Sequence, residues 1–186
     1  MRILGTSAKW LFILCLVLPS PCHSIGWAAN SLCLYRYGFD KYNVSHTTGL
    51  AQSELEKAAG GLISYFNSDE EYISLTVIKD GEPFVLFNQR EVTHLKDVKG
   101  LIWLDYRVLL GTLIYVLGYA AVSLWWRRKK YWRRLAWGWV GGGGITIVLM
   151  LALGLGTLFN FDQLFLQFHF ISFTNELWQL DPTKDY

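Results

Sequence analysis

Residues 108–134 read VLLGTLIYVLGYAAVSLWWRRKKYWRR, a charge-free run of nineteen residues followed by six basic residues and no acid. At about 1.5 Å per residue, a helix over the charge-free part is long enough to cross the roughly 30 Å hydrocarbon core of a bilayer. A nucleic-acid-binding segment is the alternative interpretation of such a basic run. We favour a short basic loop between two membrane spans, which is the usual mark of the cytoplasmic side. The stretch therefore predicts a membrane protein without a nucleic-acid partner.

The composition supports a membrane protein with one modest polar domain. Of the 186 residues, 52% are hydrophobic and 17% are charged, which is too apolar for an ordinary soluble domain. Two further apolar runs lie at residues 10–29 and 135–159. We expect an uncleaved first helix that is kinked near Pro19 and Pro21. In the third helix, the glycine run at 141–144 either allows close helix packing or loosens the helix.

The basic loop fixes an orientation for the whole chain. The predicted segments are a cytoplasmic tip at 1–9, a first transmembrane helix at 10–29, an extracytoplasmic domain at 30–103, a second transmembrane helix at 104–126, the cytoplasmic loop at 127–134, a third transmembrane helix at 135–159 and an extracytoplasmic interfacial segment at 160–186. Every Asp and Glu falls in the two outer segments or at their membrane edges, which agrees with this arrangement. The predicted fold class is a multi-pass α-helical membrane protein with a small mixed α/β extracytoplasmic domain.

The outer domain contains one helical pattern and one hairpin pattern. Apolar residues recur at three- and four-residue intervals over 53–66, which predicts an amphipathic helix. Two short runs at 72–78 and 83–87 flank Asp80 and the glycine after it, a dipeptide typical of hairpin turns. Three cysteines are an odd number, and their spacing matches neither a disulfide framework nor a metal site. A bridge between the second and third cysteine stays open.

The polar run at 87–101, FNQREVTHLKDVKGL, carries the first candidate site. If the run is helical, Glu91, His94 and Asp97 share one face, so that an imidazole stands between two carboxylates. An imidazole takes up and returns a proton near neutral pH, which suits general acid–base catalysis. The alternative is a solvated helix face with ordinary charge pairs.

A second candidate, His169, lies in the aromatic carboxy-terminal segment. A helix there, with Asp162 as its expected N-cap, places Phe165, His169 and Phe173 on one face. A histidine among aromatic side chains is either a packed, hydrogen-bonded residue or part of a site. The predicted topology puts it on the same side of the membrane as His94.

Three segments of the chain resemble one known family: LYRYGFDKYNVSHTTGL at 34–50, FNQREVTHLKDVKGL at 87–101 and FHFISFTNELWQLDPTKD at 168–185. In order, and over nearly the whole chain, they are similar to the lipoprotein intramolecular transacylase (Lit) family of bacterial integral membrane proteins. The resemblance implies an enzyme of the bacterial cell membrane with its active site on the extracytoplasmic face. It implies acyl transfer from the diacylglyceryl group of a diacylated lipoprotein to the α-amino group of its N-terminal cysteine. The product is a lyso-form lipoprotein.

The family's two functional histidines would correspond to His94 and His169. Imidazoles suit this reaction because an α-amino group, with a pKa near about 7.7–8.0, has to lose a proton before it attacks the ester. The sequence contains no Gly-x-Ser-x-Gly elbow, so no acyl-serine is expected, whereas an acyl-imidazole stays open. Family members usually continue into a fourth transmembrane helix, which we expect to be absent from this chain.

Six further side chains are candidates for supporting the histidines or binding the substrate: Arg90, Glu91, Asp97, Asn175, Trp178 and Asp181. Glu91 or Asp97 could fix the tautomer of His94. The guanidinium of Arg90 could meet a lipid phosphate or an oxyanion or, more ordinarily, a carboxylate.

Two rival interpretations remain. The first is that four of the candidate side chains bind a metal ion instead, namely His94, Asp97, His169 and Asp181. No His-Glu-x-x-His spacing is present, and we expect neither a metal nor a cofactor. The rival function is a non-enzymatic membrane adaptor whose outer domain binds a lipid or protein partner. Membrane phospholipid is an expected partner of the chain.

Overall fold

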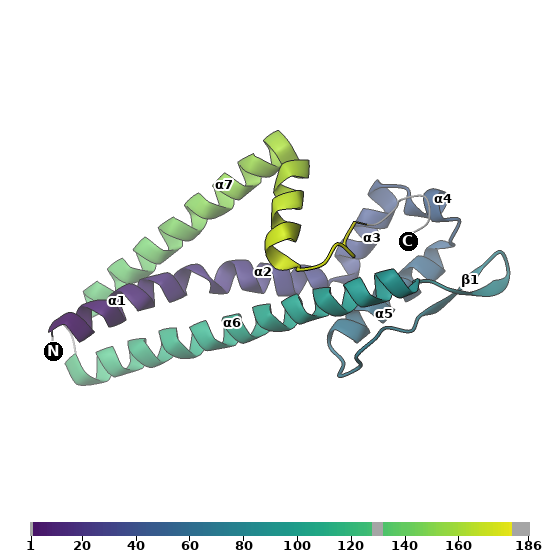
Figure 1. Ribbon diagram of the computed structural model, residues 1–186. Coiled ribbons are helices and arrows are strands. Elements are labelled where there is room, and N and C mark those ends of the chain that lie inside the picture. The colour runs from purple at the N-terminus through teal and green to yellow at the C-terminus, as the bar shows by residue number, and fades with distance from the viewer. Residues whose placement is uncertain (1, 128–131, 180–186) are drawn as a thin grey trace. The chain divides into compact units, whose positions relative to one another are not determined.

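The computed structural model describes residues 2–127 and 132–179, and leaves residues 1, 128–131 and 180–186 undescribed. Its elements in chain order (Figure 1) are α1 (Arg2–Val17), α2 (Pro19–Ala29), α3 (Leu32–Lys41), α4 (Val44–Thr48), α5 (Gln52–Phe66), β1 (Thr76–Lys79), β2 (Glu82–Val85), α6 (Gln89–Arg127) and α7 (Trp132–Ser172). The described residues are mostly helical and contain a small two-stranded sheet, as predicted. The chain forms two compact units: Met1–Gly26 with Leu104–Gln167, and Trp27–Trp103 with Phe168–Tyr186.

Three helical segments of the described chain are long and apolar enough to cross a membrane. They run over Thr6–Ala29, Gln89–Trp125 and Leu135–Ser172, in agreement with the three apolar runs of the sequence. The first is interrupted at Leu18, immediately before Pro19. Proline has no N–H to continue the hydrogen bonds of α1, and its fixed φ suits the first position of α2. The kink expected near the prolines is therefore confirmed.

The first unit packs around an apolar cluster of α1, α6 and α7 side chains, namely Phe12, Leu16, Val116 and Leu135. Two glycines of α7 lie against this cluster. A Cβ at Gly138 would come within 2.9 Å of the Phe12 ring, and a Cβ at Gly142 within 2.6 Å of the Leu16 Cβ. The Thr146 hydroxyl, one turn further on, lies 3.3 Å from the carbonyl oxygen of Val17 in α1. The glycines thus allow close packing, and α7 continues through the run at 141–144 without a break.

Helix α7 bends at Asn160, where the backbone leaves the helical conformation (φ −157°, ψ 75°), and Figure 1 shows the change of direction. The Asn160 Oδ1 atom accepts a hydrogen bond from the N–H of Gln163 at 3.2 Å, the pattern of an N-cap. The prediction that Asp162 caps this helix is wrong. A capping side chain lies three residues before the N–H group that it binds. For the N–H group of Gln163, that residue is Asn160.

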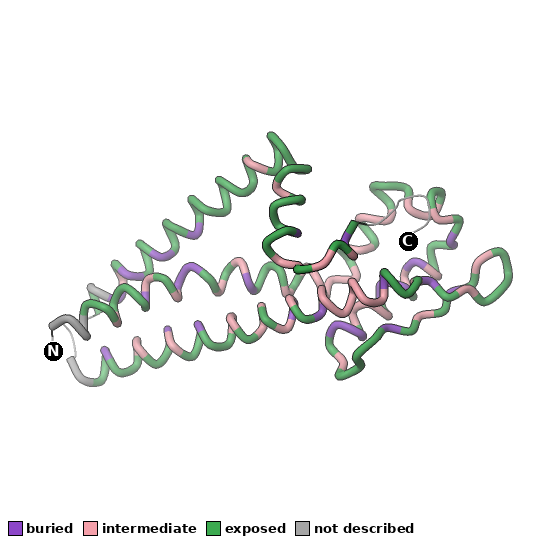
Figure 2. The backbone as a smooth tube through the Cα atoms, viewed as in Figure 1, coloured by how far each residue is buried: buried purple, intermediate pink, exposed green. Residues whose placement is uncertain are grey.

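Many large apolar side chains of α6 and α7 are exposed, and Figure 2 shows exposed residues along both helices, most densely along α7. Leu117 in α6 is 65% exposed and Leu158 in α7 is 82% exposed. Contiguous apolar surface of this extent is rare on soluble proteins. These exposed apolar side chains suit contact with lipid chains, because contact with hydrocarbon keeps them out of water.

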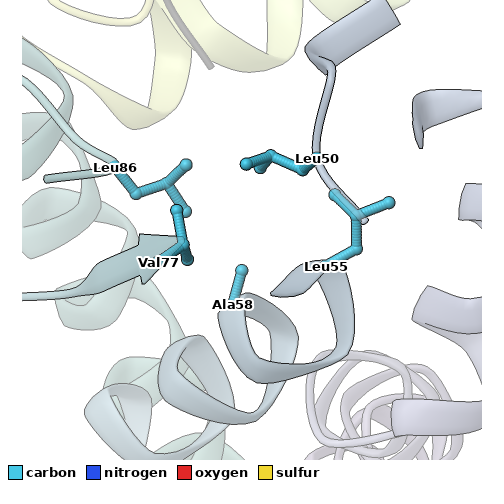
Figure 3. Packing of buried hydrophobic residues seen from close by; sticks show 5 residues of the cluster. All are labelled: Leu50, Leu55, Ala58, Val77 and Leu86. Carbon is cyan, nitrogen blue, oxygen red and sulfur yellow. The ribbon is translucent and has the colours of Figure 1, made fainter. Parts of the chain in front are cut away.

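The second unit is built on a β-hairpin against α5. The antiparallel strands pair Thr76 with Val85 and Lys79 with Glu82, and Asp80 (φ 53°) and Gly81 (φ 85°) form the turn. The buried core, shown in Figure 3, consists of Leu50, Leu55, Ala58, Val77 and Leu86. The predicted helix at 53–66 and the predicted hairpin are confirmed, although both strands are shorter than expected.

Helices α3 and α4 lie over residues for which the sequence patterns predicted no structure. The local signal was present at the start of α3, where the hydroxyl of Ser31 accepts a hydrogen bond from the N–H of Leu34 at 3.4 Å. In the next segment Asn43 adopts a left-handed conformation (φ 51°) before the short α4. All three cysteines are free, so the bridge that the sequence left open, between Cys22 and Cys33, does not form.

Candidate functional site

The site begins with the capping of α6. The Asn88 side chain accepts hydrogen bonds from the N–H groups of Arg90 (2.9 Å) and Glu91 (3.0 Å). In return, the Glu91 carboxylate accepts from the Asn88 N–H at 2.7 Å. This reciprocal capping box fixes where the helix starts and therefore which face carries His94. Glu91 is only 3% exposed, and its carboxylate serves the helix end. The suggestion that Glu91 fixes the tautomer of His94 is not supported by this geometry.

The two predicted histidines lie together in the second unit. The ring centroids of His94 in α6 and His169 near the end of α7 are 6.4 Å apart, with the ring planes 30° from parallel. Phe173 contacts both rings, with centroid distances of 5.1 Å to His94 and 5.5 Å to His169. The two imidazoles are close enough for one small reacting group to be reached from both.

Aromatic side chains enclose the second histidine. The Trp178 ring lies 4.8 Å from the His169 ring between centroids, with the planes tilted by 37°, and Phe168 meets His169 edge-on at 5.3 Å. His169 is 8% exposed and Trp178 is 6% exposed. Trp178, a candidate from the sequence, therefore lies beside His169, and His169 is at once a packed histidine and a neighbour of His94.

The loop at 173–179 is tied to α6 by two sets of hydrogen bonds. The Asn175 side-chain amide donates to the Asp97 carboxylate at 2.8 Å. The Arg90 guanidinium donates to the carbonyl oxygens of Glu176 at 3.1 Å and Gln179 at 2.7 Å. Arg90, in the first turn of α6, and Asp97, seven residues further on, thus hold the loop that carries Trp178.

Two of these contacts bear on roles that the sequence suggested. The Arg90 guanidinium, a candidate for meeting a lipid phosphate, an oxyanion or a carboxylate, binds two backbone carbonyl groups within the described chain. Asp97 was a candidate for fixing the His94 tautomer, and its carboxylate accepts from Asn175 instead. The buried Nδ1 atom of His94 has no hydrogen-bond partner among the described residues. Asp97 acts on the imidazole through its charge rather than through a hydrogen bond.

The proton affinity of His94 follows from its surroundings. His94 belongs to the polar part of α6, at 89–103, which precedes the charge-free stretch at 108–126. Burial lowers the pKa of His94, the nearby imidazole of His169 lowers it further, and the charge of Asp97 raises it in part. His94 is therefore held in its neutral form near pH 7, the form that accepts a proton.

Metal binding was the rival use of these side chains. Within residues 2–127 and 132–179, no three His, Cys, Asp or Glu side chains lie together as a metal ion requires. Asp181, the remaining candidate ligand and site residue, lies outside the described residues.

Comparison with known proteins identifies the family of the chain. The family model of the lipoprotein intramolecular transacylase Lit matches residues 10–186. The chain belongs to the Lit family. Membership makes it an acyltransferase of the membrane and disfavours the non-enzymatic adaptor. Comparison with curated protein sequences gives no match.

Solved structures show the same fold. The structure of the membrane-integral lipoprotein intramolecular transacylase Lit from Bacillus cereus superposes with a TM-score of 0.79 at 18% identity, covering 100% of this chain and 80% of that one. Two histidine-substituted forms of the same protein give TM-scores of 0.72 (histidine to arginine, 17% identity) and 0.63 (histidine to alanine, 18% identity). Each covers 99% of this chain and 76% of the other.

Proposed function

We propose that this acyltransferase moves an acyl chain within one lipoprotein molecule, from the diacylglyceryl group to the α-amino group of the N-terminal cysteine. The product is a lyso-form lipoprotein. The observation that carries the proposal is the His94–His169 pair, 6.4 Å apart between ring centroids and enclosed by Phe173 and Trp178. Family membership supplies the substrate class, since the family name specifies a lipoprotein.

The reaction balances without any co-reactant. The amine nitrogen forms a bond to the ester carbonyl carbon, and the bond from that carbon to the glyceryl oxygen breaks. One proton leaves the amine and one proton reaches the glyceryl oxygen, so an ester and an amine become an amide and a hydroxyl group. Two imidazoles on either side of the reacting atoms can serve both proton transfers.

We assign the base to His94. Its lowered pKa keeps the imidazole neutral near pH 7, and its Nδ1 atom has no hydrogen-bond partner within the described chain. His169 is then placed to return a proton to the glyceryl oxygen or to donate to the oxyanion. Because donor and acceptor belong to one substrate, holding them in the attacking geometry supplies much of the rate.

We also propose the orientation given by the basic loop. The spans at 10–29, 104–126 and 135–159 would cross the bacterial cell membrane, and the domain at 30–103 would lie outside with the segment at 160–186. The site would then face the extracytoplasmic surface, next to membrane phospholipid. The asymmetry of basic residues supports this orientation.

Mass spectrometry of a reporter lipoprotein tests the reaction. Diacylated substrate and lyso-form product are isomers, so the total mass stays constant while the attachment of one acyl chain changes. Cells that make this protein should yield amino-terminal peptides that keep one acyl chain after mild alkaline cleavage of esters. Cells without it should yield peptides that lose both chains. A product heavier by one acyl chain would show that another lipid is the donor and would overturn the intramolecular mechanism.

A further inference from the structure

A pocket of about 380 Å³ adjoins the histidine pair in the second unit. Lys96, Asp97, Gly100 and Leu101 of α6 line one part of it, and residues 172–175 line the rest. The lining includes the residues three positions after each histidine, which is one helical turn along α6 from His94 and along α7 from His169. The volume lies in the range of pockets that bind small ligands.

The pocket follows α6 away from His94. Its lining on this helix runs from Lys96 and Asp97, close to one turn after His94, to Gly100 and Leu101. In the sequence, the charge-free stretch begins seven residues after Leu101, at Val108. An occupant of this pocket would therefore lie along the part of α6 that follows the imidazole of His94.

The lining is amphiphilic. Leu101 and Phe173 supply apolar surface, and Ser172 and Thr174 bring hydroxyl groups. The two charged side chains of the lining already have partners within the chain. The Asp97 carboxylate accepts a hydrogen bond from the Asn175 amide. The Lys96 ammonium pairs with the Glu71 carboxylate and lies 4.7 Å from the ring centre of Tyr72. Such a lining suits an uncharged group with hydrogen-bond acceptors and a hydrocarbon tail, the chemistry of a fatty-acyl ester.

We propose that this pocket binds the glyceryl ester and the first carbons of its acyl chain, and that Gly100 leaves the room for them. The inference rests on the proposed function, because a diacylglyceryl ester is the donor there. A Cβ on Gly100 would meet no atom within 4 Å, so the missing side chain leaves open space rather than a packed contact. Because Gly100 lines the pocket, we expect a larger side chain at this position to take up part of that space.

Gly100→Leu tests the steric part of the proposal, with Gly111→Leu as the matched control. Both glycines lie in α6, both are exposed, and a Cβ at either position would have no neighbouring atom within 4 Å. Leucine also favours helix over glycine, so neither change weakens the helix intrinsically. Gly100→Leu should raise the KM for a diacylglyceryl lipopeptide by about tenfold or more, while Gly111→Leu stays near the wild-type value. Equal KM values in the two variants would overturn the pocket assignment.

Photo-cross-linking tests occupancy without requiring turnover. A photoreactive residue is placed at Thr174 in the pocket lining or, as control, at Glu82 on the hairpin, both in a His169→Ala background. Two alkyne-tagged probes are offered in nanodiscs, a diacylglyceryl lipopeptide and phosphatidylglycerol. Preferential cross-linking of the lipopeptide at Thr174 supports the proposal. Cross-linking only of phosphatidylglycerol, or equal yields at the two positions, contradicts it.

The proposed reaction and the proposed pocket can be refuted independently of each other. If the lipopeptide cross-links at Thr174 but wild-type protein forms no lyso-form product, the proposed reaction is wrong and the pocket assignment stands. If lyso-form product appears but neither probe prefers Thr174, the reaction stands and the pocket assignment is wrong.

Discussion

Removal of the Arg90 guanidinium should loosen the loop at 173–179 without unfolding the protein. The guanidinium donates to two carbonyl oxygens of the loop, at 3.1 Å and 2.7 Å. A hydrogen bond from a charged donor is worth about 1.5–3 kcal/mol when it is sheltered. Arg90 is exposed, so screening by solvent reduces the expected effect to about 1 kcal/mol. The ratio of closed to open loop should therefore fall about fivefold in Arg90→Ala.

Hydrogen exchange measured by mass spectrometry reads this ratio directly. The amides of Leu177 and Gln179, which are hydrogen-bonded within the loop, should exchange about fivefold faster in Arg90→Ala. Activity should fall by no more than that factor, since the loop carries Trp178 against His169 but leaves both imidazoles in place. Arg36→Ala is the matched control, because Arg36 is an exposed arginine of the same unit, paired with Glu56. Unchanged loop exchange in Arg90→Ala would refute the role of Arg90 as an anchor of the loop.

Three further outcomes follow from the structure. Gly142→Ala should destabilise the protein by about 1–3 kcal/mol, because its Cβ would stand 2.6 Å from a facing leucine Cβ. Gly143→Ala, whose Cβ meets no atom within 4 Å, should not lower the thermal midpoint in detergent, since alanine favours helix over glycine. Activity should fall on acidification with a midpoint below the usual histidine value of about 6.5, because the neutral form of His94 is required and its pKa is lowered. In Asp97→Asn that midpoint should move lower still, since the charge of Asp97 raises the pKa, and a midpoint that moves upward would contradict this assignment. A cysteine introduced at Glu82 should react with a membrane-impermeant reagent in intact cells, and labelling only after permeabilisation would reject the proposed orientation.

Much of the fold was predictable because it depends on patterns local in the sequence. The apolar runs, the three-to-four periodicity of α5 and the Asp80 turn each determine an element by themselves. Helices α3 and α4 were missed because their apolar faces are short and their packing against other elements is not visible in the sequence. The cap of the bend in α7 was misplaced by two residues, since both Asn160 and Asp162 have side chains able to cap.

The candidate site, like the fold, was predictable from the sequence only in part. The pairing of His94 and His169 was expected from the predicted topology and the family motifs, and the structure brings the two rings together. The roles of their neighbours were less predictable. Glu91 lies in the capping box, and Arg90 binds carbonyl groups of residues more than eighty positions away. Contacts of such sequence separation depend on the tertiary fold rather than on local spacing.

The central claim is that His94 and His169 act as one catalytic pair, and a double-mutant comparison of lyso-lipoprotein formation tests it most directly. His94→Ala and His169→Ala should each reduce the rate by about 10²–10⁴-fold. The double variant should be little slower than the slower single variant, because residues that act as a unit are not additive. His46→Ala, which removes an exposed histidine of the same unit, is the control at equal expression. A near-wild-type rate in either single variant, or losses that multiply in the double variant, would contradict the claim.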